Sequence, residues 1–562
     1  MRVGMVSLED GITSCGFRKM AAYVARLNPD TEAFYVTTAR YKSIRNGITG
    51  GRGNGGDLTD DEVDQVAEGL LGVDLLGLSS MTGYSGVTRR VVKRVRELDP
   101  SVFIIWGGIH PIIHPEDAIT ADVDAICTGE GEFAFHEFFD AFKEGRDHTQ
   151  VKNFWFKRGD EVIRNQFLPL MTAEEMETLP FPLYREKEQI YRPGEGFEPI
   201  KLADYVANDG LSYTAIWSIG CPFHCTYCGN TKFIANDLKY KRIRHPSARY
   251  MVEQIKDVRT RSPQIWHVNF QDDSFMAIPY PQLAEFAELW KAELDIPFAV
   301  YGVIPNYVKK DKFEILTWAG MNRVRMGIQS GSQEILDFYQ RPSPPEKILA
   351  AGEVIASFAP QYHLPAVYDI IMDNPIETRK NVRETLQLLY DMPRPYSLLI
   401  YSLKVIPNTE LERAMKERGV ELDKIDSSYL VIPPRLANVL LYLLCIVKPP
   451  EWLWRRLLGR VRASTEPQKL YPRLGMFLRI LYLLRRVVPH VIRLDFSITP
   501  GWVGYAAWRL GLVRLWHRRF NPRMSKPAPP PPRRSGARQV LTLVPEQPVA
   551  VEADQPVRSA ES

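Results

Sequence analysis

Three cysteines lie within eight residues in the stretch SIGCPFHCTYCGN. They are Cys221, Cys225 and Cys228, half of the six cysteines in a chain of 562 residues. A structural zinc site takes four ligands, usually as two pairs. His224 is available as a fourth ligand, but no second pair follows. A four-iron, four-sulfur cluster takes one ligand on each iron, so three thiolates leave one iron open to a small molecule. The spacing therefore favours such a cluster over zinc.

Strand and helix patterns alternate over residues 1–150. Apolar runs such as RVGMVSL and VFIIWGG predict buried strands, and amphipathic runs such as GVTRRVVKRVREL predict the helices between them. This alternation indicates a parallel sheet with helices on both faces. Ligands of such sheets lie beyond the carboxyl ends of the strands, which here carry SSMTGYSG, WGGIHP and TGEGE.

Residues 206–425 alternate again and predict about six strand–helix units. This pattern indicates an open or partial barrel whose functional groups lie on the loops after the strands. The cysteine stretch follows the first predicted barrel strand, YTAIWSIG. Residues 151–205 are expected to be a connector with some strand character.

The motif C-x3-C-x2-C at the end of a first barrel strand, with the aromatic Tyr227 before the last cysteine, resembles the radical S-adenosylmethionine (radical SAM) enzymes. The resemblance implies that Cys221, Cys225 and Cys228 hold a [4Fe–4S] cluster, that the methionine part of S-adenosylmethionine chelates the open iron, and that Tyr227 contacts this cofactor. One electron, from an external donor such as flavodoxin or ferredoxin, then cleaves this cofactor and gives a 5′-deoxyadenosyl radical.

Other stretches match the same family in the same order. NFQDDSF resembles the strand end that reaches the amino group of S-adenosylmethionine, with Asp272 or Asp273 as the contact. MGIQSGSQEIL resembles the strand near the ribose, with Ser330 as the candidate, although Gln329 stands where Glu is usual. Two turns depart from the family pattern, because Asp373 and Asn408 stand where glycine is common.

The N-terminal half resembles the cobalamin-binding radical SAM enzymes through CGFRKMAAYV, WGGIHP, TGEGEFAF and LPFPLY. The match covers roughly residues 1–420 and implies a Rossmann-like cobalamin-binding domain. The candidate cobalamin contacts are Ser79, Gly107, Gly108, His110, Gly129 and Glu130. No D-x-H-x-x-G motif occurs, so we expect no histidine on the lower face of the cobalt. A loop cap explains His110 at least as well as a cobalt contact.

The two halves together imply a C-methyltransferase. One S-adenosylmethionine would methylate cobalamin, a second would give the radical that removes hydrogen from an unactivated carbon, and the substrate radical would take the methyl group. The cofactors supply this chemistry, while the protein orients them and excludes water. The alternatives are radical oxidation or ring formation on the same scaffold, as in tetrapyrrole cyclases of this family, and a non-catalytic cobalamin or cluster sensor.

The segment 426–525 has a different composition. Residues 431–525 hold 15 Arg and 2 Lys against 3 acidic residues, a local charge of +14 in a chain of net charge +4. The longest uninterrupted apolar run, VLLYLLCIV, has nine residues, whereas a membrane-spanning helix needs about 20. We therefore expect a helical extension that contacts an anionic membrane without spanning it, which would suit a lipid, isoprenoid or other hydrophobic substrate.

Five tryptophans of this segment are candidates for the membrane interface: Trp452, Trp454, Trp502, Trp508 and Trp516. A packed cap on the barrel is the main alternative. Nucleic-acid binding is disfavoured, because nothing resembles an RNA-binding module. Residues 526–562 hold 8 Pro and are expected to form a disordered tail.

The N-terminus lacks the basic and apolar regions of a secretory signal. Six cysteines in so long a chain do not form a disulfide framework, and Cys15, Cys127 and Cys445 lie far apart. We therefore expect a cytoplasmic enzyme that is at most peripheral on the inner face of the membrane.

Overall fold

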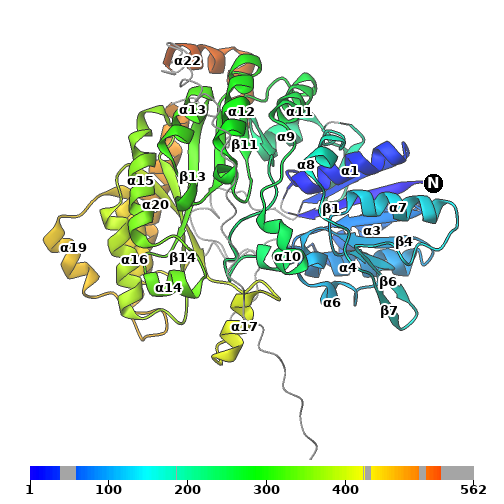
Figure 1. The fold of residues 1–562 in the computed structure, drawn as a ribbon, viewed down its shortest axis with the longest axis horizontal. Coiled ribbons are helices and arrows are strands. Elements are labelled where there is room, and N and C mark those ends of the chain that lie inside the picture. Colours follow the sequence, from blue (N-terminus) through cyan, green and yellow to red (C-terminus); the bar gives the residue numbers. More distant parts are fainter. Residues whose placement is uncertain are drawn as a thin grey trace, which may run out of the picture. The chain divides into compact units, whose positions relative to one another are not determined.

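A largely parallel sheet and an all-parallel sheet, one after the other along the chain, organise the molecule (Figure 1). The computed structural model describes residues 1–9, 11–37, 58–184, 186–421, 423, 432–492 and 501–520, all within the unit Met1–Ala528. The Pro-rich tail expected at 526–562 lies outside the described residues.

In the part of the chain that the structure describes, the first sheet has nine strands in the order β7-β6-β5-β4-β3-β1-β2-β8-β9. They are β1 (Val3–Glu9), β2 (Thr31–Thr37), β3 (Leu75–Ser79), β4 (Phe103–Gly107), β5 (Ala125–Cys127), β6 (Phe154–Arg158), β7 (Glu161–Arg164), β8 (Glu188–Arg192) and β9 (Gly196–Pro199). Strands β1 to β5 and β8 pair in parallel, and β6, β7 and β9 pair antiparallel at the edges. The stretch 151–205, expected as a connector, thus contributes two strands to each edge of the sheet.

Helices cover both faces of this sheet. They are α1 (Cys15–Leu27), α3 (Asp60–Gly69), α4 (Ser85–Leu98), α5 (Ile109–Ile113), α6 (Pro115–Ala118), α7 (Glu132–Lys143), α8 (Ala173–Glu177) and α9 (Leu202–Asp209). Helices α1 and α7 share one buried cluster, through Phe17 and Phe138, and α3 and α4 share another, through Val66 and Val91. Strand β1 is buried along all but its last residue, as expected for a strand covered on both faces. The predicted Rossmann-like α/β sheet is confirmed.

The second sheet has six strands in sequence order, all parallel. They are β10 (Ser212–Ala215), β11 (His267–Phe270), β12 (Phe298–Val303), β13 (Met321–Gln329), β14 (Ala366–Met372) and β15 (Tyr396–Ser402). The helices are α10 (Asn230–Asn236), α11 (Ala248–Arg261), α12 (Tyr280–Glu293), α13 (Lys310–Ala319), α14 (Gln333–Phe338), α15 (Pro345–Ser357), α16 (Arg379–Asp391) and α17 (Glu410–Glu417). This arrangement confirms the predicted partial barrel.

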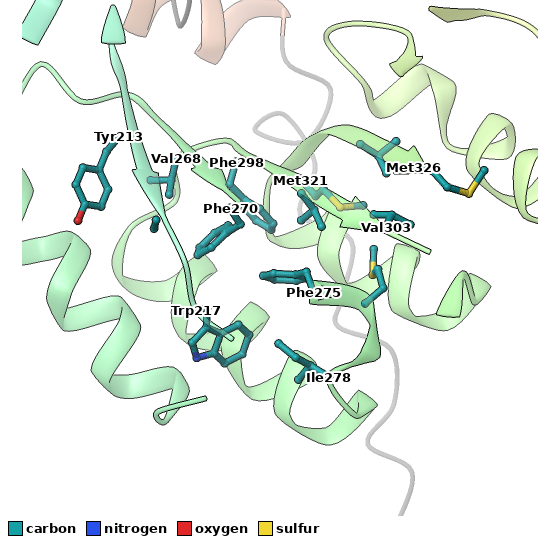
Figure 2. Packing of buried hydrophobic residues seen from close by; sticks show 14 of the residues in the cluster. Tyr213, Trp217, Val268, Phe270, Phe275, Ile278, Phe298, Val303, Met321 and Met326 are labelled. Atoms are coloured by element: carbon teal, nitrogen blue, oxygen red, sulfur yellow. The ribbon is translucent and has the colours of Figure 1, made fainter. Parts of the chain in front are cut away.

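One face of the barrel strands is apolar and packs against the helices. The ring of Phe270 lies 5.6 Å from Trp290 of α12 and 5.9 Å from Phe298 of β12, measured between ring centroids (Figure 2). Successive side chains of a strand point to opposite faces, so Asn269 faces away from the helices. The inner face of the barrel is therefore available for a site.

The C-terminal extension is helical, with α18 (Leu436–Ile446), α19 (Glu451–Leu458), α20 (Pro472–Ile492), α21 (Gly501–Arg509) and α22 (Leu512–Phe520). Helix α18 packs against α16, α20 and β15. The Tyr482 hydroxyl of α20 donates to the Leu398 carbonyl of β15. No described helix combines the length and the apolar character that crossing a bilayer demands.

Trp454 corrects one expectation. It was a candidate for a membrane interface, but it is only 1% exposed. Its ring stacks on Tyr390 of α16 at a centroid distance of 5.0 Å, and its indole N–H donates to Gln387 over 3.0 Å. Because both partners belong to the barrel, this part of the extension is a packed cap.

Candidate functional site

The cysteine stretch forms the loop between β10 and α10, and Asp272 at the end of β11 anchors its start. The Asp272 carboxylate accepts hydrogen bonds from the N–H groups of Trp217 (3.2 Å) and Ser218 (2.5 Å) and from the Ser218 hydroxyl (2.6 Å). Burial raises the pKa of this carboxyl to about 7. One candidate for the amino group of S-adenosylmethionine is therefore already engaged by the loop.

Asp273 is the candidate that lines the cavity beside the cysteines. Its carboxylate accepts a hydrogen bond from the Tyr240 hydroxyl over 3.4 Å, and burial raises its pKa. Gly302 on β12, with φ of 66°, makes the close approach of β11 and β12 possible. An added Cβ there would lie 1.9 Å from the Asp272 carbonyl oxygen. The glycine thus lets both aspartates sit at the end of the strand.

The centre of the loop is held from the other side of the barrel. The Thr226 N–H donates to the Tyr339 carbonyl over 3.0 Å, and its carbonyl accepts from the Leu411 N–H over 2.9 Å. Tyr339 follows α14 and Leu411 lies in α17, so the loop bridges elements that are distant in sequence. Tyr227, the predicted aromatic contact of S-adenosylmethionine, meets the Tyr339 ring edge-on at 4.9 Å.

Arg341 places a buried positive charge beside the cysteines. Its Nη1 donates to the Tyr227 hydroxyl over 3.3 Å and lies 3.7 Å from Cys225 Sγ, and its Nη2 donates to the Gly327 carbonyl. Sequence reasoning missed this residue. Its local context, QRPSP, has no helical or strand periodicity that would assign it to a site, and only the turn after α14 brings it to the loop.

The three thiols suit a cluster better than a single ion. Burial raises the pKa of Cys221 to about 11 and that of Cys228 to about 12, so forming thiolates requires a bound metal. Among the described residues, no group of three or more His, Cys, Asp or Glu side chains converges as one metal ion would require. A four-iron cluster takes each thiolate on its own iron, and the three thiols fit that group.

Ser330, the ribose candidate, follows Gln329, which adopts a left-handed φ of 72°. The Ser330 hydroxyl lies 3.1 Å from the Thr385 hydroxyl of α16 and accepts from the Ser332 N–H over 3.2 Å. These bonds hold the turn after β13 against α16. A contact of Ser330 with the ribose stays a prediction.

The cobalamin candidates lie at the carboxyl edge of the first sheet. Ser79 and Gly107 end β3 and β4 and pair with each other in register. Gly108 has φ of 87°, and an added Cβ would lie 2.8 Å from Ser79 Oγ. At Gly129 an added Cβ would lie 2.6 Å from Asn153. Without side chains, the two glycines let the loops after β4 and β5 pack closely against Ser79 and Asn153, and we call this carboxyl edge the backbone cradle.

His110, a further candidate, lies inside the protein. It is 1% exposed, its ring packs on Trp106 at 5.0 Å between centroids, and its Nε2 lies 3.0 Å from the Asp117 carboxylate. Burial lowers its pKa to about 4, so the ring is neutral at pH 7. This geometry matches the loop-cap interpretation. Ile109 and Ile112, from the same helix, line the cavity.

A cavity of about 430 Å³ lies where the first sheet meets the barrel. Its walls come from α1, the carboxyl edge of the first sheet, β10 and the cysteine loop. Gly129, Glu130 and Asp273 are the predicted site residues among its lining. Most of the remaining wall is apolar, with Ile109, Ile112, Phe167, Leu170, Trp217 and Phe233. The start of the cysteine loop and part of the carboxyl edge of the first sheet therefore border one partly open cavity.

Side chains from both halves lock the walls together. Arg244, after the cysteine loop, donates from Nη2 to Glu130 Oε1 over 2.7 Å, and the other Glu130 oxygen accepts from the Met171 N–H over 2.7 Å. Asn408, before α17, donates from Nδ2 to the Ile113 carbonyl of α5 over 3.0 Å. Glu130 thus serves as a bridge as well as a wall of the cavity.

The two residues that replace common glycines keep the backbone of a glycine. Asn408 has φ of 59° and Asp373 has φ of 60°. Asn and Asp tolerate this left-handed region better than other residues with a side chain. Each gains a contact that glycine cannot make, since Asp373 pairs with Arg435 of the extension at 2.7 Å.

Two family models match the chain. A B12 binding domain covers residues 52–139, which hold the carboxyl edge of the first sheet, and a radical SAM superfamily domain covers residues 216–389, which hold the cysteine loop. The chain belongs to the cobalamin-binding radical SAM enzymes. The cofactors of this enzyme are accordingly a [4Fe–4S] cluster, S-adenosylmethionine and cobalamin.

Named relatives cover most of this radical SAM enzyme. An uncharacterized methyltransferase of Pyrococcus horikoshii is 24% identical over 61% of this chain and 69% of its own. The anaerobic magnesium-protoporphyrin IX monomethyl ester cyclase of Synechocystis is 26% identical over 77% of this chain and 83% of its own. The structure of the radical SAM methyltransferase TsrM of Kitasatospora setae, with cobalamin and a [4Fe–4S] cluster bound, superposes with a TM-score of 0.57 at 15% identity. It covers 74% of this chain and 75% of that one, a likeness of fold.

Proposed function

We propose that this radical SAM enzyme is a C-methyltransferase that acts on an unactivated carbon of a hydrophobic or lipid-like substrate. The observation that carries the proposal is the shared cavity, which the cysteine loop and the carboxyl edge of the first sheet line together. Ligands held at these two edges would face one shared and largely apolar cavity. Direct transfer between them and a substrate requires such an arrangement.

The roles of the chain follow from its geometry. When bound, the cluster and S-adenosylmethionine supply a radical and cobalamin supplies a methyl group. The cluster would be held by Cys221, Cys225 and Cys228. The Asp273 carboxylate would accept a hydrogen bond from the amino group of S-adenosylmethionine. The apolar walls exclude water, which protects a reactive intermediate.

The remaining assignments belong to the same proposal. The backbone cradle at the carboxyl edge of the first sheet would hold cobalamin, with no histidine on the cobalt. Tyr227 and Ser330 would border S-adenosylmethionine on the barrel side. An external one-electron donor such as flavodoxin or ferredoxin would reduce the cluster.

The products of S-adenosylmethionine test the proposal. The full chain, reconstituted anaerobically with iron, sulfide and cobalamin, is incubated with S-adenosylmethionine and a chemical reductant. We expect both S-adenosylhomocysteine, which reports methyl transfer, and 5′-deoxyadenosine, which reports radical formation. Omitting cobalamin should abolish the first product and leave the second.

The second candidate function is radical oxidation or ring formation. The cyclase relative favours it, because that match extends over 77% of this chain. The oxidation or ring-formation hypothesis predicts that 5′-deoxyadenosine forms without S-adenosylhomocysteine. Absence of both products from a protein loaded with cluster and cobalamin would indicate a sensor instead.

We also propose that the C-terminal extension contacts an anionic membrane surface. Large apolar side chains are exposed along it, including Trp452, Phe477, Leu484, Ile492, Trp502, Leu510 and Leu515. Trp502 and Leu510 are each 75% exposed. Arginines lie among them, and each basic residue near an anionic bilayer adds about 1 kcal/mol. Exposed apolar groups set among basic ones are typical of interfacial helices.

Vesicle flotation tests this contact with the full chain. We expect flotation with phosphatidylcholine vesicles that contain phosphatidylglycerol, and weaker flotation at high salt. The double variant Trp502→Glu/Leu510→Glu should lose most of it. Leu238→Glu is a matched control, because Leu238 is 72% exposed but lies beside the cysteine loop. Equal flotation of both variants would refute the membrane contact and remove one support for a lipid-like substrate.

A further inference from the structure

A row of polar side chains crosses the inner face of the barrel, one from each strand. They are Ser212 (β10), Asn269 (β11), Tyr301 (β12), Arg325 (β13), Asp369 (β14) and Tyr401 (β15). The alternate side chains, such as Phe270 and Phe298, pack against the helices instead (Figure 2). The inside of a small closed barrel is usually filled by bulky apolar layers. Here the corresponding face carries a charge pair and hydroxyl groups.

The first half of the row is joined by hydrogen bonds between neighbouring strands. The Asn269 amide donates to Ser212 Oγ over 3.2 Å, and the Tyr301 hydroxyl donates to Asn269 Oδ1 over 3.3 Å. Thr214 of β10 and Gln271, which directly follows β11, line the cavity. The row therefore begins beside the cavity wall and continues across the barrel.

Arg325 lies at the centre of the other half. Its Nε donates to both oxygens of Asp369, over 2.8 and 2.9 Å, and its Nη2 donates to the Tyr401 hydroxyl. The guanidinium carbon lies 6.0 Å from the ring centroids of both Tyr301 and Tyr401. These contacts fix the plane of the guanidinium group. No hydrogen bond joins Nη1 to any residue in the described part of the chain.

The pair is neither sealed in a core nor open to bulk solvent. The Arg325 side chain is 27% exposed and that of Asp369 is 13% exposed. Replacing a partly desolvated ion pair by apolar residues often leaves a protein as stable or more stable. Stability therefore gives little reason for the pair, whereas ligand binding does. A fixed guanidinium with an unused N–H edge suits a carboxylate or a phosphate, because its planar donors match their oxygens.

We propose that Arg325 binds an acidic group of the substrate, a carboxylate or a phosphate, while the rest of the substrate reaches along the row into the apolar cavity. The inference rests on the proposed function and deepens it, because it narrows a hydrophobic substrate to an acidic amphiphile. Asp369 and Tyr401 are positioning residues that hold the guanidinium, and Asn269 and Tyr301 border the path.

Direct binding of model amphiphiles tests this inference independently of the reaction. Octanoate, octyl phosphate and octanol are titrated calorimetrically into the full-length protein loaded with cluster and cobalamin. We expect either acid to bind at least about tenfold more tightly than octanol, as one charge-assisted hydrogen bond would provide. Arg325→Gln should remove this preference and leave octanol binding unchanged. Whichever acid is preferred identifies a carboxylate or a phosphate as the natural group.

Arg192→Gln is the matched control. Arg192 pairs with Asp204 at 2.6 Å, and these side chains are 31% and 12% exposed, close to the values of the Arg325 pair. It lies on β8 of the first sheet, so its removal should leave the preference for acids intact. Protection of Arg325 against phenylglyoxal by octanoate, located by mass spectrometry, gives a readout on the unmutated chain if Arg325→Gln does not fold.

Equal affinity of the unmutated protein for octanoate, octyl phosphate and octanol would overturn the inference. So would an unchanged acid preference in Arg325→Gln, or labelling of Arg325 that octanoate does not slow. None of these results bears on whether S-adenosylhomocysteine is formed. Failure of the methyltransferase proposal and failure of this one are therefore distinguishable.

Discussion

The carboxyl edge of the first sheet and the loop after β10 are both ligand edges of parallel strands, yet they are built by opposite means. The first edge requires glycine at two positions, because a Cβ at Gly108 or Gly129 would clash with neighbouring atoms. At the second it depends on side chains that are present. Asp272 supplies the acceptors that shape the loop, and Arg341 supplies a buried charge.

This difference would suit the ligands that we propose for the two edges. The first edge would meet a large macrocycle with closely packed backbone, which the two glycines make possible. A cluster is small and needs specific donors at fixed places. The first edge should therefore fail when atoms are added, and the second when atoms are removed.

The largest effect is expected from Cys225→Ala. Loss of one of three thiolates should lower bound iron and both products of S-adenosylmethionine by at least about 100-fold, because each thiolate holds its own iron. Iron and sulfide analysis after anaerobic reconstitution measures it. Cys445→Ala is the control, since Cys445 is buried in α18. Retention of a complete cluster in Cys225→Ala would show that another group provides the third ligand.

Asp272→Ala should act on the same loop without touching a thiol. It leaves the buried Trp217 and Ser218 N–H groups without their acceptor, which costs about 3 kcal/mol because buried donors are left unpaired. Urea unfolding of the reconstituted protein measures the loss, and iron should dissociate faster. Asp272→Asn keeps an acceptor oxygen and should lose less. If alanine and asparagine behave alike, the acceptor role is wrong.

Gly108→Ala probes the other edge by adding one carbon. The new Cβ would meet Ser79 Oγ at 2.8 Å, and φ of 87° is strained for alanine. We expect a loss of about 2 kcal/mol in stability and about tenfold weaker cobalamin binding, measured by absorbance titration. Gly83→Ala is the control, because no atom lies within 4 Å of its added Cβ. Similar cobalamin affinities for the two variants would show that the close approach at Gly108 is not required.

Lowering the pH should reduce the stability of the folded protein through His110, and this is the smallest of the four expected effects. Burial lowers its pKa from 6.5 to about 4, so the folded protein prefers the neutral ring. Its contribution is fully present above pH 6.5 and falls as the pH drops toward 4, by about 2 kcal/mol between pH 7 and 5. Asp117, His114 and Arg89 face the ring and modulate this value.

Urea unfolding at the two pH values measures the loss. His110→Gln should lose less stability on acidification than the unmutated chain. His136→Gln, which alters a half-exposed histidine of α7, serves as the control. An equal acid sensitivity of His110→Gln and the unmutated chain would contradict this assignment.

Much of the fold and the cysteine motif could be predicted from patterns among residues that are close together in the sequence. The alternation of strands and helices predicted the barrel sheet and the central strands of the first sheet, because each element is defined within about ten residues by its own periodicity. The cysteine motif could be recognised from the sequence for the same reason, since metal ligands on one loop have a short, fixed spacing. Asp373 and Asn408, which stand where glycine is common in the family, adopt the left-handed backbone that a glycine would adopt.

Contacts between distant segments could not be inferred in this way. The strands β8 and β9 join the far edge of the first sheet, next to β2, which lies about 150 residues earlier. We predicted that Trp454 lies at a membrane interface. The composition of the C-terminal segment does not distinguish an interfacial indole ring from one stacked on Tyr390. Both outcomes depend on which surface is nearby after folding.

The sequence by itself determined the family, the two sheets and the three thiols, because each is encoded in residues that are neighbours along the chain. Only the tertiary structure decided that Asp272 anchors the cysteine loop and that Arg341 lies beside Cys225. It also decided that Arg325 of β13 pairs with Asp369 of the adjacent strand β14. The partners in these pairs are 54, 116 and 44 residues apart. Their pairing is set by strand order, register and the packing of loops, none of which leaves a local trace in composition or periodicity.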